Sequence, residues 1–87
     1  MELGIKNKYA LVTGCSKNIG KAIATHLSKQ GVNIIGIARS KNELLILKKE
    51  IDNYSNDNHI IVIDLLKKNS VNIIKNYLIK KNINIDI

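Results

Sequence analysis

Apolar residues along this chain alternate between short runs and longer stretches in which they recur every three or four positions. The short runs at 9–13, 33–38 and 59–63 are almost continuously apolar, which predicts buried parallel strands. The longer stretches between them carry polar residues on one side and apolar residues on the other, which predicts helices with one buried face. The chain therefore alternates strand and helix from residue 9 onward.

Capping residues mark the ends of the predicted helices. The first helix covers about 19–30, and Gly31 follows it in the position of a C-cap. Ser40 and Glu43 have the spacing of a capping box, in which each side chain satisfies a free backbone amide of the other residue. Asn82 is placed to end the third helix. These signals divide the helices from the strands.

The third helix and the segment after it complete the pattern. The spacing predicts a helix over about 68–81, with Val71, Ile74 and Leu78 on its buried side. Residues 83–87 predict a fourth, short strand. The order β-α-β-α-β-α-β is that of an α/β fold with a doubly wound parallel sheet, because crossovers between parallel strands are right-handed.

Length and composition allow one small domain, over 1–87, with 45% hydrophobic residues. A single cysteine excludes an internal disulfide, and without zinc-type Cys/His spacing we expect no metal. No apolar stretch approaches the roughly 20 residues that span a bilayer, and residues 1–6 do not resemble a signal peptide. We therefore expect no membrane association and a cytoplasmic protein.

The formal net charge of +7 raises the question of nucleic acid as a partner. The lysines are spread along the chain rather than gathered on one element, and three tyrosines without Phe or Trp offer little surface for base stacking. We therefore do not expect nucleic-acid binding. His26, on the inner edge of the first helix, and His59, at the start of a strand, are interpreted as structural or solvated.

The segment 13–20, Thr-Gly-Cys-Ser-Lys-Asn-Ile-Gly, lies between the first strand and the first helix. A phosphate-binding turn occupies this place in doubly wound folds. Gly14 allows a sharp turn, residue 18 stands where the backbone approaches a pyrophosphate, and Gly20 allows the helix to pack on the strand. The helix N-terminus offers free amides and a positive dipole end to phosphates. The plain alternative is a pair of turn and packing glycines.

This segment resembles the T-G-x-x-x-G-x-G motif of short-chain dehydrogenases/reductases, with Asn18 in place of the middle glycine. Asparagine tolerates positive φ, which the turn is expected to need, although its side chain crowds the pyrophosphate. The resemblance implies a partial Rossmann fold, truncated after the first third to half of the family domain. It also implies phosphate contacts from Gly14, Ser16, Lys17, Asn18, Ile19 and Gly20.

The same resemblance predicts the choice of cofactor. The second strand ends at Arg39 and Ser40, where members that prefer NAD carry an acidic residue that binds the ribose. Arg39 is suited to pair with a 2′-phosphate, and Lys17 adds a second cation, so NADP(H) is predicted over NAD(H). Asp64 and Leu65 match the pair that lies against the adenine. The alternatives are a solvated Arg39 and an Asp64 that caps the next helix.

No catalytic residue is predicted in this chain. In the family the catalytic serine, tyrosine and lysine follow the fourth strand, and Tyr77 with Lys81 matches the family spacing in the wrong place. The predicted function is therefore the cofactor-binding part of an NADP(H)-dependent oxidoreductase that transfers hydride to or from a carbonyl or alcohol, inactive by itself. The alternative is a non-catalytic nucleotide-binding or interaction module. An open sheet edge predicts poor folding or self-association.

Overall fold

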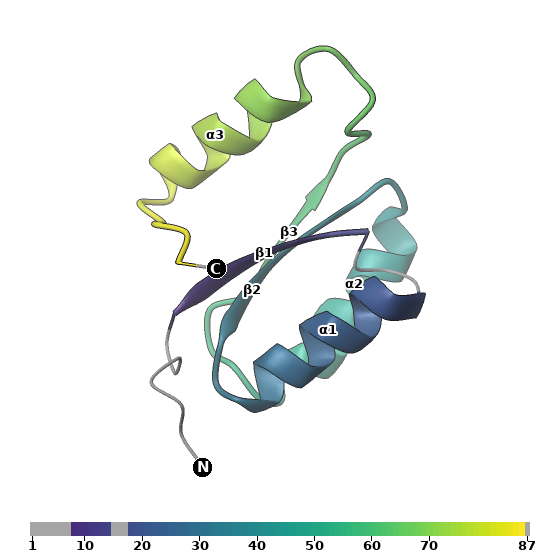
Figure 1. The fold of residues 1–87 in the computed structure, drawn as a ribbon, viewed down its shortest axis with the longest axis vertical. Helices are drawn as coiled ribbons and strands as arrows, with labels where there is room; N and C mark the ends of the chain where they lie inside the picture. Colours follow the sequence, from purple (N-terminus) through teal and green to yellow (C-terminus); the bar gives the residue numbers. More distant parts are fainter. Residues whose placement is uncertain (1–7, 15–17, 87) are drawn as a thin grey trace.

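A computed structural model of the chain describes residues 8–14 and 18–86. Within these residues, strands and helices alternate along the chain and build an α/β fold (Figure 1). The predicted fold class is thereby confirmed. In chain order the elements are β1 (Tyr9–Thr13), α1 (Asn18–Lys29), β2 (Asn33–Ala38), α2 (Lys41–Ile51), β3 (His59–Val62) and α3 (Ser70–Lys80).

The three strands form one parallel sheet in the order β1-β2-β3. Tyr9 is paired with Asn33, and Ile35 is paired with His59. Strand β2 is central and is buried from Asn33 to Ile37. A continuously apolar strand needs cover on both faces of its sheet, which the helices provide.

Helices lie on both faces of the sheet, with α1 and α2 on one side and α3 on the other (Figure 1). Successive residues of a strand point to opposite faces. Accordingly Ile34 packs in the core under α1 and α2, and Ile35 and Ile37 pack in the core under α3. The larger core also holds Ala10, Val12, Ala24, Val32, Leu44, Leu47 and Ile51.

The predicted N-cap at Ser40 and the predicted helix end at Gly31 are confirmed. The Ser40 hydroxyl accepts the Glu43 backbone N–H at 3.3 Å, so Ser40 is the N-cap of α2. Gly31, with φ of 87°, donates its N–H to the Ser28 carbonyl at 2.9 Å after α1. Asn82 follows α3 with φ of 57°, the left-handed conformation that asparagine tolerates.

The C-terminal segment differs from the prediction. Residues 83–86 do not form the expected fourth strand. Asp86 donates its backbone N–H to the Tyr9 carbonyl at 2.9 Å, but the Tyr9 N–H is accepted by the Asp86 carboxylate at 3.0 Å. The Asp86 side chain therefore accepts the Tyr9 N–H, which a backbone carbonyl would accept in a strand pair. Val71 is also 71% exposed, because the buried side of α3 consists of Ile74, Tyr77 and Leu78.

The buried side chain of Asn58 ties β2 to the loop before β3. Its Oδ1 accepts the Ile34 backbone N–H at 2.8 Å and the Ser55 hydroxyl at 2.9 Å. Its Nδ2 donates to the Asp52 carboxylate at 3.0 Å and to the Ser55 carbonyl at 3.1 Å. A buried amide with both ends satisfied stabilises one arrangement and penalises others, so this side chain fixes the entry into β3.

A second polar network joins α3 to the amino end of the sheet. The Tyr9 hydroxyl donates to the Asp57 carboxylate, which also bonds His59 Nε2 at 2.9 Å. His59 Nδ1 bonds the Tyr77 hydroxyl of α3 at 2.8 Å. The hydrogen bond to Asp57 raises the pKa of Tyr9 to about 12, and the same bond lowers the pKa of the Asp57 carboxyl. Tyr77 and His59 thus have structural roles.

Replacing Asn58 with alanine is expected to destabilise the fold by about 2–3 kcal/mol, because the buried Ile34 N–H loses its acceptor. The thermal midpoint, followed by circular dichroism at one fixed protein concentration, should fall by about 10 °C or more. Asn56→Ala, at an exposed position two residues earlier in the same loop, is the matched control. Equal midpoints for the two variants would contradict the role assigned to Asn58.

The raised pKa of Tyr9 predicts an alkaline loss of stability. Folding favours the neutral phenol, so its contribution is complete below pH 10 and is lost as pH rises toward 12. Thermal midpoints measured between pH 9 and pH 12 should fall less steeply in Tyr9→Phe than in the parent chain. Tyr54→Phe, at an exposed tyrosine, should follow the parent chain. Parallel declines in the parent and Tyr9→Phe would contradict the prediction.

Candidate functional site

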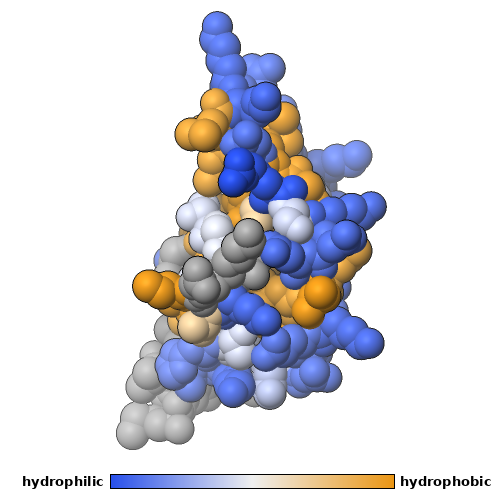
Figure 2. All heavy atoms as spheres, turned by 90° about the vertical axis from the view of Figure 1, so that its right-hand side faces the viewer, coloured by the Kyte–Doolittle hydropathy of each residue, from blue (hydrophilic) through white to orange (hydrophobic). Residues whose placement is uncertain are grey.

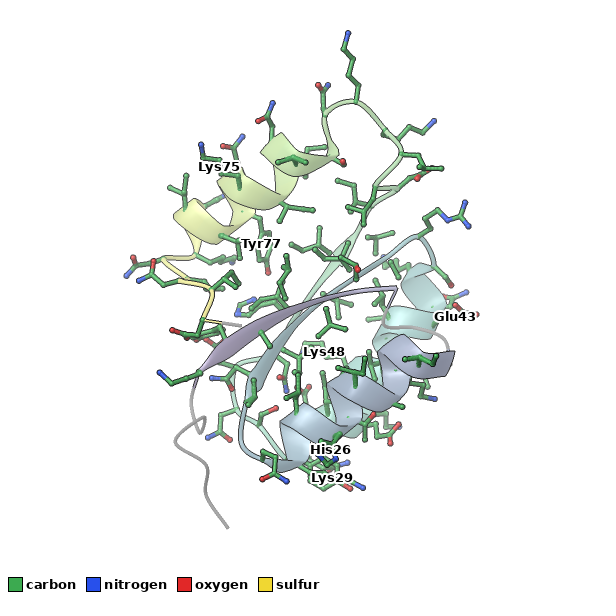
Figure 3. The ribbon with its side chains drawn as sticks, in the orientation of Figure 1. His26, Lys29, Glu43, Lys48, Lys75 and Tyr77 are labelled. Atoms are coloured by element: carbon green, nitrogen blue, oxygen red, sulfur yellow. The ribbon has the colours of Figure 1, made fainter. Side chains whose placement is uncertain are left out.

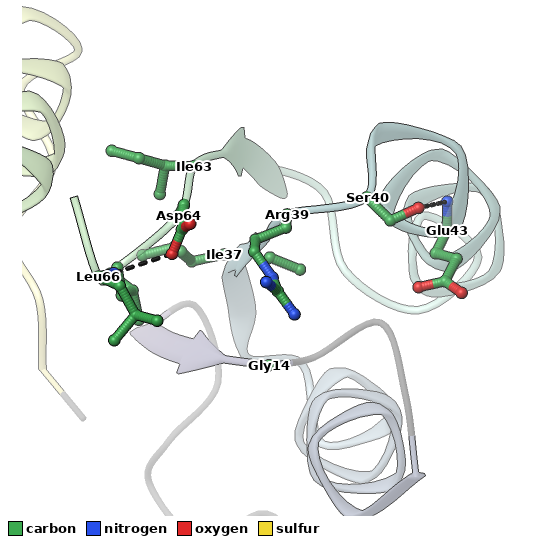
Figure 4. Close-up of a pocket in the computed structure, with 10 residues that line it drawn as sticks. Gly14, Ile37, Arg39, Ser40, Glu43, Ile63, Asp64 and Leu66 are labelled. Carbon is green, nitrogen blue, oxygen red and sulfur yellow. Dashed lines mark hydrogen bonds between the residues drawn. The ribbon is translucent and has the colours of Figure 1, made fainter.

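The carboxyl ends of the three parallel strands meet at one edge of the sheet and open into a cavity. Because β1, β2 and β3 run in the same direction, the residues that follow them gather there. The cavity has a volume of about 680 Å³ (Figure 4). It is lined by Gly14, Ile37, Ala38, Arg39, Ser40, Glu43, Ile63, Asp64, Leu65 and Leu66.

Gly14 forms the wall of the cavity that follows β1. Its φ is 60°, and its N–H donates to the Ile37 carbonyl at 2.8 Å, so the turn is bonded to the central strand. A Cβ built on Gly14 would meet no atom of the described residues within 4 Å. The backbone conformation favours glycine, and the space beside it is open. Both features fit a turn over which a phosphate group lies.

The start of α1 completes this part of the edge. Asn18 is the first residue of the helix. Helical residues normally have negative φ, so the expectation of positive φ at Asn18 disagrees with its place in the helix. Ile19 is 75% exposed and Gly20 is half-buried; neither lines the cavity. Ser16 and Lys17, predicted to contact phosphates, lie outside the described residues. The first amides of a helix have no partner within that helix, so this end of α1 is suited to bind an anion.

Arg39 and Ser40 form the wall that follows β2. Arg39 is exposed and is the only cation among the described lining residues. Ser40 lines the cavity while its hydroxyl caps α2. Glu43, in the first turn of α2, also lines the cavity and was not among the predicted site residues. Its place in the capping box was the available signal, because a residue at that position lies beside the helix entrance.

Asp64 and Leu65 form the third wall, after β3. The Asp64 carboxylate accepts the Leu66 N–H at 2.9 Å, which fixes the turn at the strand end. Asp64 does not cap α3, since that helix begins at Ser70 with Asn69 as its N-cap. The Ser70 hydroxyl donates to the Leu65 carbonyl at 3.2 Å and ties the turn to the helix.

The rim of this edge exposes apolar side chains. Leu66 is 90% exposed and Leu65 is 45% exposed. Figure 2, which faces the right-hand side of Figure 1, shows hydrophobic groups lying among hydrophilic ones there. Exposed apolar surface at a cavity mouth is typical of a site that receives an apolar ligand surface such as an aromatic base.

Other predicted or excluded residues lie away from the cavity. His26 is exposed on the outer side of α1, next to Lys29, and not on the inner edge as predicted (Figure 3). Lys81 lies 6.0 Å from the centre of the Tyr77 ring, while the Tyr77 hydroxyl bonds His59. In the part of the chain that the structure describes, no three His, Cys, Asp or Glu side chains are grouped to hold a metal. No described helix is long and apolar enough to cross a membrane.

Comparison with known proteins identifies the family to which this site belongs. The family model for short chain dehydrogenases matches residues 8–87. The chain belongs to the short-chain dehydrogenase family. Its described architecture agrees with that family's fold: L-sorbose reductase from Gluconobacter frateurii, solved with NADPH and L-sorbose, superposes with a TM-score of 0.91 and 25% identity, covering 99% of this chain and 33% of that one.

Two curated relatives are more similar to this chain in sequence than that reductase is. NADPH-dependent pterin aldehyde reductase of Arabidopsis thaliana is 42% identical over 60 residues, covering 69% of this chain and 24% of the relative. Inactive hydroxysteroid dehydrogenase-like protein 1 of Homo sapiens is 41% identical over 58 residues, covering 66% of this chain and 18% of the relative. The chain thus spans about a quarter or less of these relatives.

Proposed function

We propose that this chain is the cofactor-binding part of an NADP(H)-dependent short-chain oxidoreductase. The observation that carries the proposal is the cavity at the carboxyl edge of the sheet, where Gly14, Arg39 and Asp64 each follow a different strand. Ligands of open α/β sheets bind outside the carboxyl ends of the strands. The open space beside Gly14 and the size of the cavity fit a dinucleotide.

Each wall of the cavity has a distinct part in the proposed binding. The turn at Gly14 and the first residues of α1, including Asn18, Ile19 and Gly20, receive the pyrophosphate, together with Ser16 and Lys17. Arg39 and Ser40 receive the 2′-phosphate, for which a guanidinium is a bidentate donor. Asp64 and Leu65 lie against the adenine.

The reaction itself is proposed for the whole protein rather than for these residues. The bound cofactor supplies the hydride, and the protein that binds the cofactor positions it. The residues of this chain bind and orient the adenine end, and we assign none of them a catalytic role. The two relatives with NADPH in their names or structures support the choice of cofactor.

A non-catalytic nucleotide-binding module is the second candidate. One relative, from Homo sapiens, is named as inactive and matches this chain over 58 residues at 41% identity. The nucleotide sequence beyond codon 87 separates the two candidates. An Asn-Asn-Ala-Gly codon run, as follows the fourth strand in the family, favours the enzyme, and unrelated sequence after a stop codon favours the module.

The cofactor preference is tested by reversing one charge. The parent chain should bind NADPH at least about tenfold more tightly than NADH, and Arg39→Asp should reverse this order by removing the phosphate partner and adding a repulsive charge. Calorimetric or fluorescence titration of both cofactors measures this. Lys41→Asp makes the same change of charge two residues away, outside the cavity lining, and should keep the parent's preference. Equal affinities of the parent chain for both cofactors would contradict the proposal.

We also propose that the outer edge of β1 pairs with a second copy of the chain. Among the described residues, Asp86 bonds this edge at its start, at Tyr9, and Ala10 to Thr13 continue along it. A strand edge left open in this way recruits another strand. Light scattering after size exclusion should give a mass above the 9.7 kDa of the monomer. A monomer with a cooperative thermal transition well above room temperature would contradict this proposal.

A further inference from the structure

Glu43 places a negative charge in the cavity that the proposed function assigns to the cofactor. It is the third residue of α2, and the Ser40 hydroxyl holds its backbone N–H at 3.3 Å. Its side chain is half-buried and lines the cavity together with Arg39. Figure 4 shows the Arg39 side chain after β2 and the Glu43 side chain in the first turn of α2 extending in the same general direction, and Figure 3 shows Glu43 at this end of the helix.

The charges of the cavity do not favour a phosphate as strongly as Arg39 alone would. Among the described lining residues Arg39 is opposed by two carboxylates, Glu43 and Asp64. The Asp64 carboxylate accepts the Leu66 N–H in the turn after β3, the wall assigned to the adenine. Glu43 is the carboxylate on the same helix entrance as Arg39 and Ser40, the residues assigned to the 2′-phosphate.

A carboxylate at this place disfavours the cofactor that carries the 2′-phosphate. A phosphate monoester carries about −1.5 to −2 charges at pH 7, whereas a ribose hydroxyl carries none. Two negative groups in a partly buried cavity repel each other more strongly than they would in water. The repulsion therefore acts on NADP(H) and leaves NAD(H) nearly unaffected.

We propose that Glu43 is a specificity-determining residue that weakens NADP(H) binding and so limits the preference that Arg39 creates. The inference rests on the proposed function, because it assumes that the 2′-phosphate lies near Arg39. With Glu43 present, the ratio of NADPH to NADH affinity should be smaller than Arg39 alone would give. Removing the Glu43 charge should increase this ratio.

Glu43→Gln tests this directly, because glutamine has the same shape and also occurs at this position of a capping box. The dissociation constants of NADPH and NADH are measured for the parent, Glu43→Gln and Glu50→Gln, with circular dichroism to compare their folds. Glu50 lies on the same helix outside the cavity lining. Glu43→Gln should tighten NADPH binding about fivefold at low salt, less at high salt, and change NADH binding by less than about twofold.

The outcomes separate the inference from the proposed function. An unchanged ratio of the two dissociation constants in Glu43→Gln, or an equal change in Glu50→Gln, overturns the inference and leaves the proposed function standing. Weaker NADH binding with unchanged NADPH binding also overturns it, since Glu43 would then be a hydrogen-bond acceptor for the ribose. If the parent chain binds neither cofactor, both the inference and the proposed function are contradicted.

Discussion

The hydrogen bond from the Ile34 backbone to the Asn58 side chain is the constraint on which the arrangement of the sheet depends. It lies one residue before the β2–β3 pairing begins at Ile35 and His59. A parallel pair has no tight turn to set its register, so the apolar pattern and the bonds of the residue that leads into the second strand set it together. With its amide also bonded to Ser55 and Asp52, Asn58 holds one register.

That register decides which residues meet at the far edge of the sheet. The Ile63 N–H donates to the Ala38 carbonyl at 2.9 Å, and the Gly14 N–H donates to the Ile37 carbonyl at 2.8 Å. These two bonds tie the first and third strand ends to the central strand. A shift by one residue would exchange the faces of β3 and carry Asp64 away from Arg39. The cavity is therefore a consequence of pairing at the opposite end of the sheet.

Much of this could be predicted from the sequence, because strands and helices have different apolar periods and the motif residues follow directly after strands. Gly14, Arg39 and Asp64 were located in this way. Glu43 was missed, because helical spacing does not tell which flank of α2 turns toward the sheet edge. The prediction of a fourth strand was wrong. The Asp86 carboxylate accepts the Tyr9 N–H that a backbone carbonyl would accept in a strand pair, and an apolar pattern does not show such side-chain bonds.

We propose above all that the carboxyl edge of the sheet binds a phosphorylated dinucleotide. Hydrogen exchange of the whole chain, followed by mass spectrometry with and without saturating NADPH, tests it most directly. We expect slower exchange in the peptides that contain Gly14, Arg39 and Asp64, and unchanged exchange around Asn58, at the amino end of β3. Protection confined to the outer side of α1 around His26, or no protection anywhere, would contradict it.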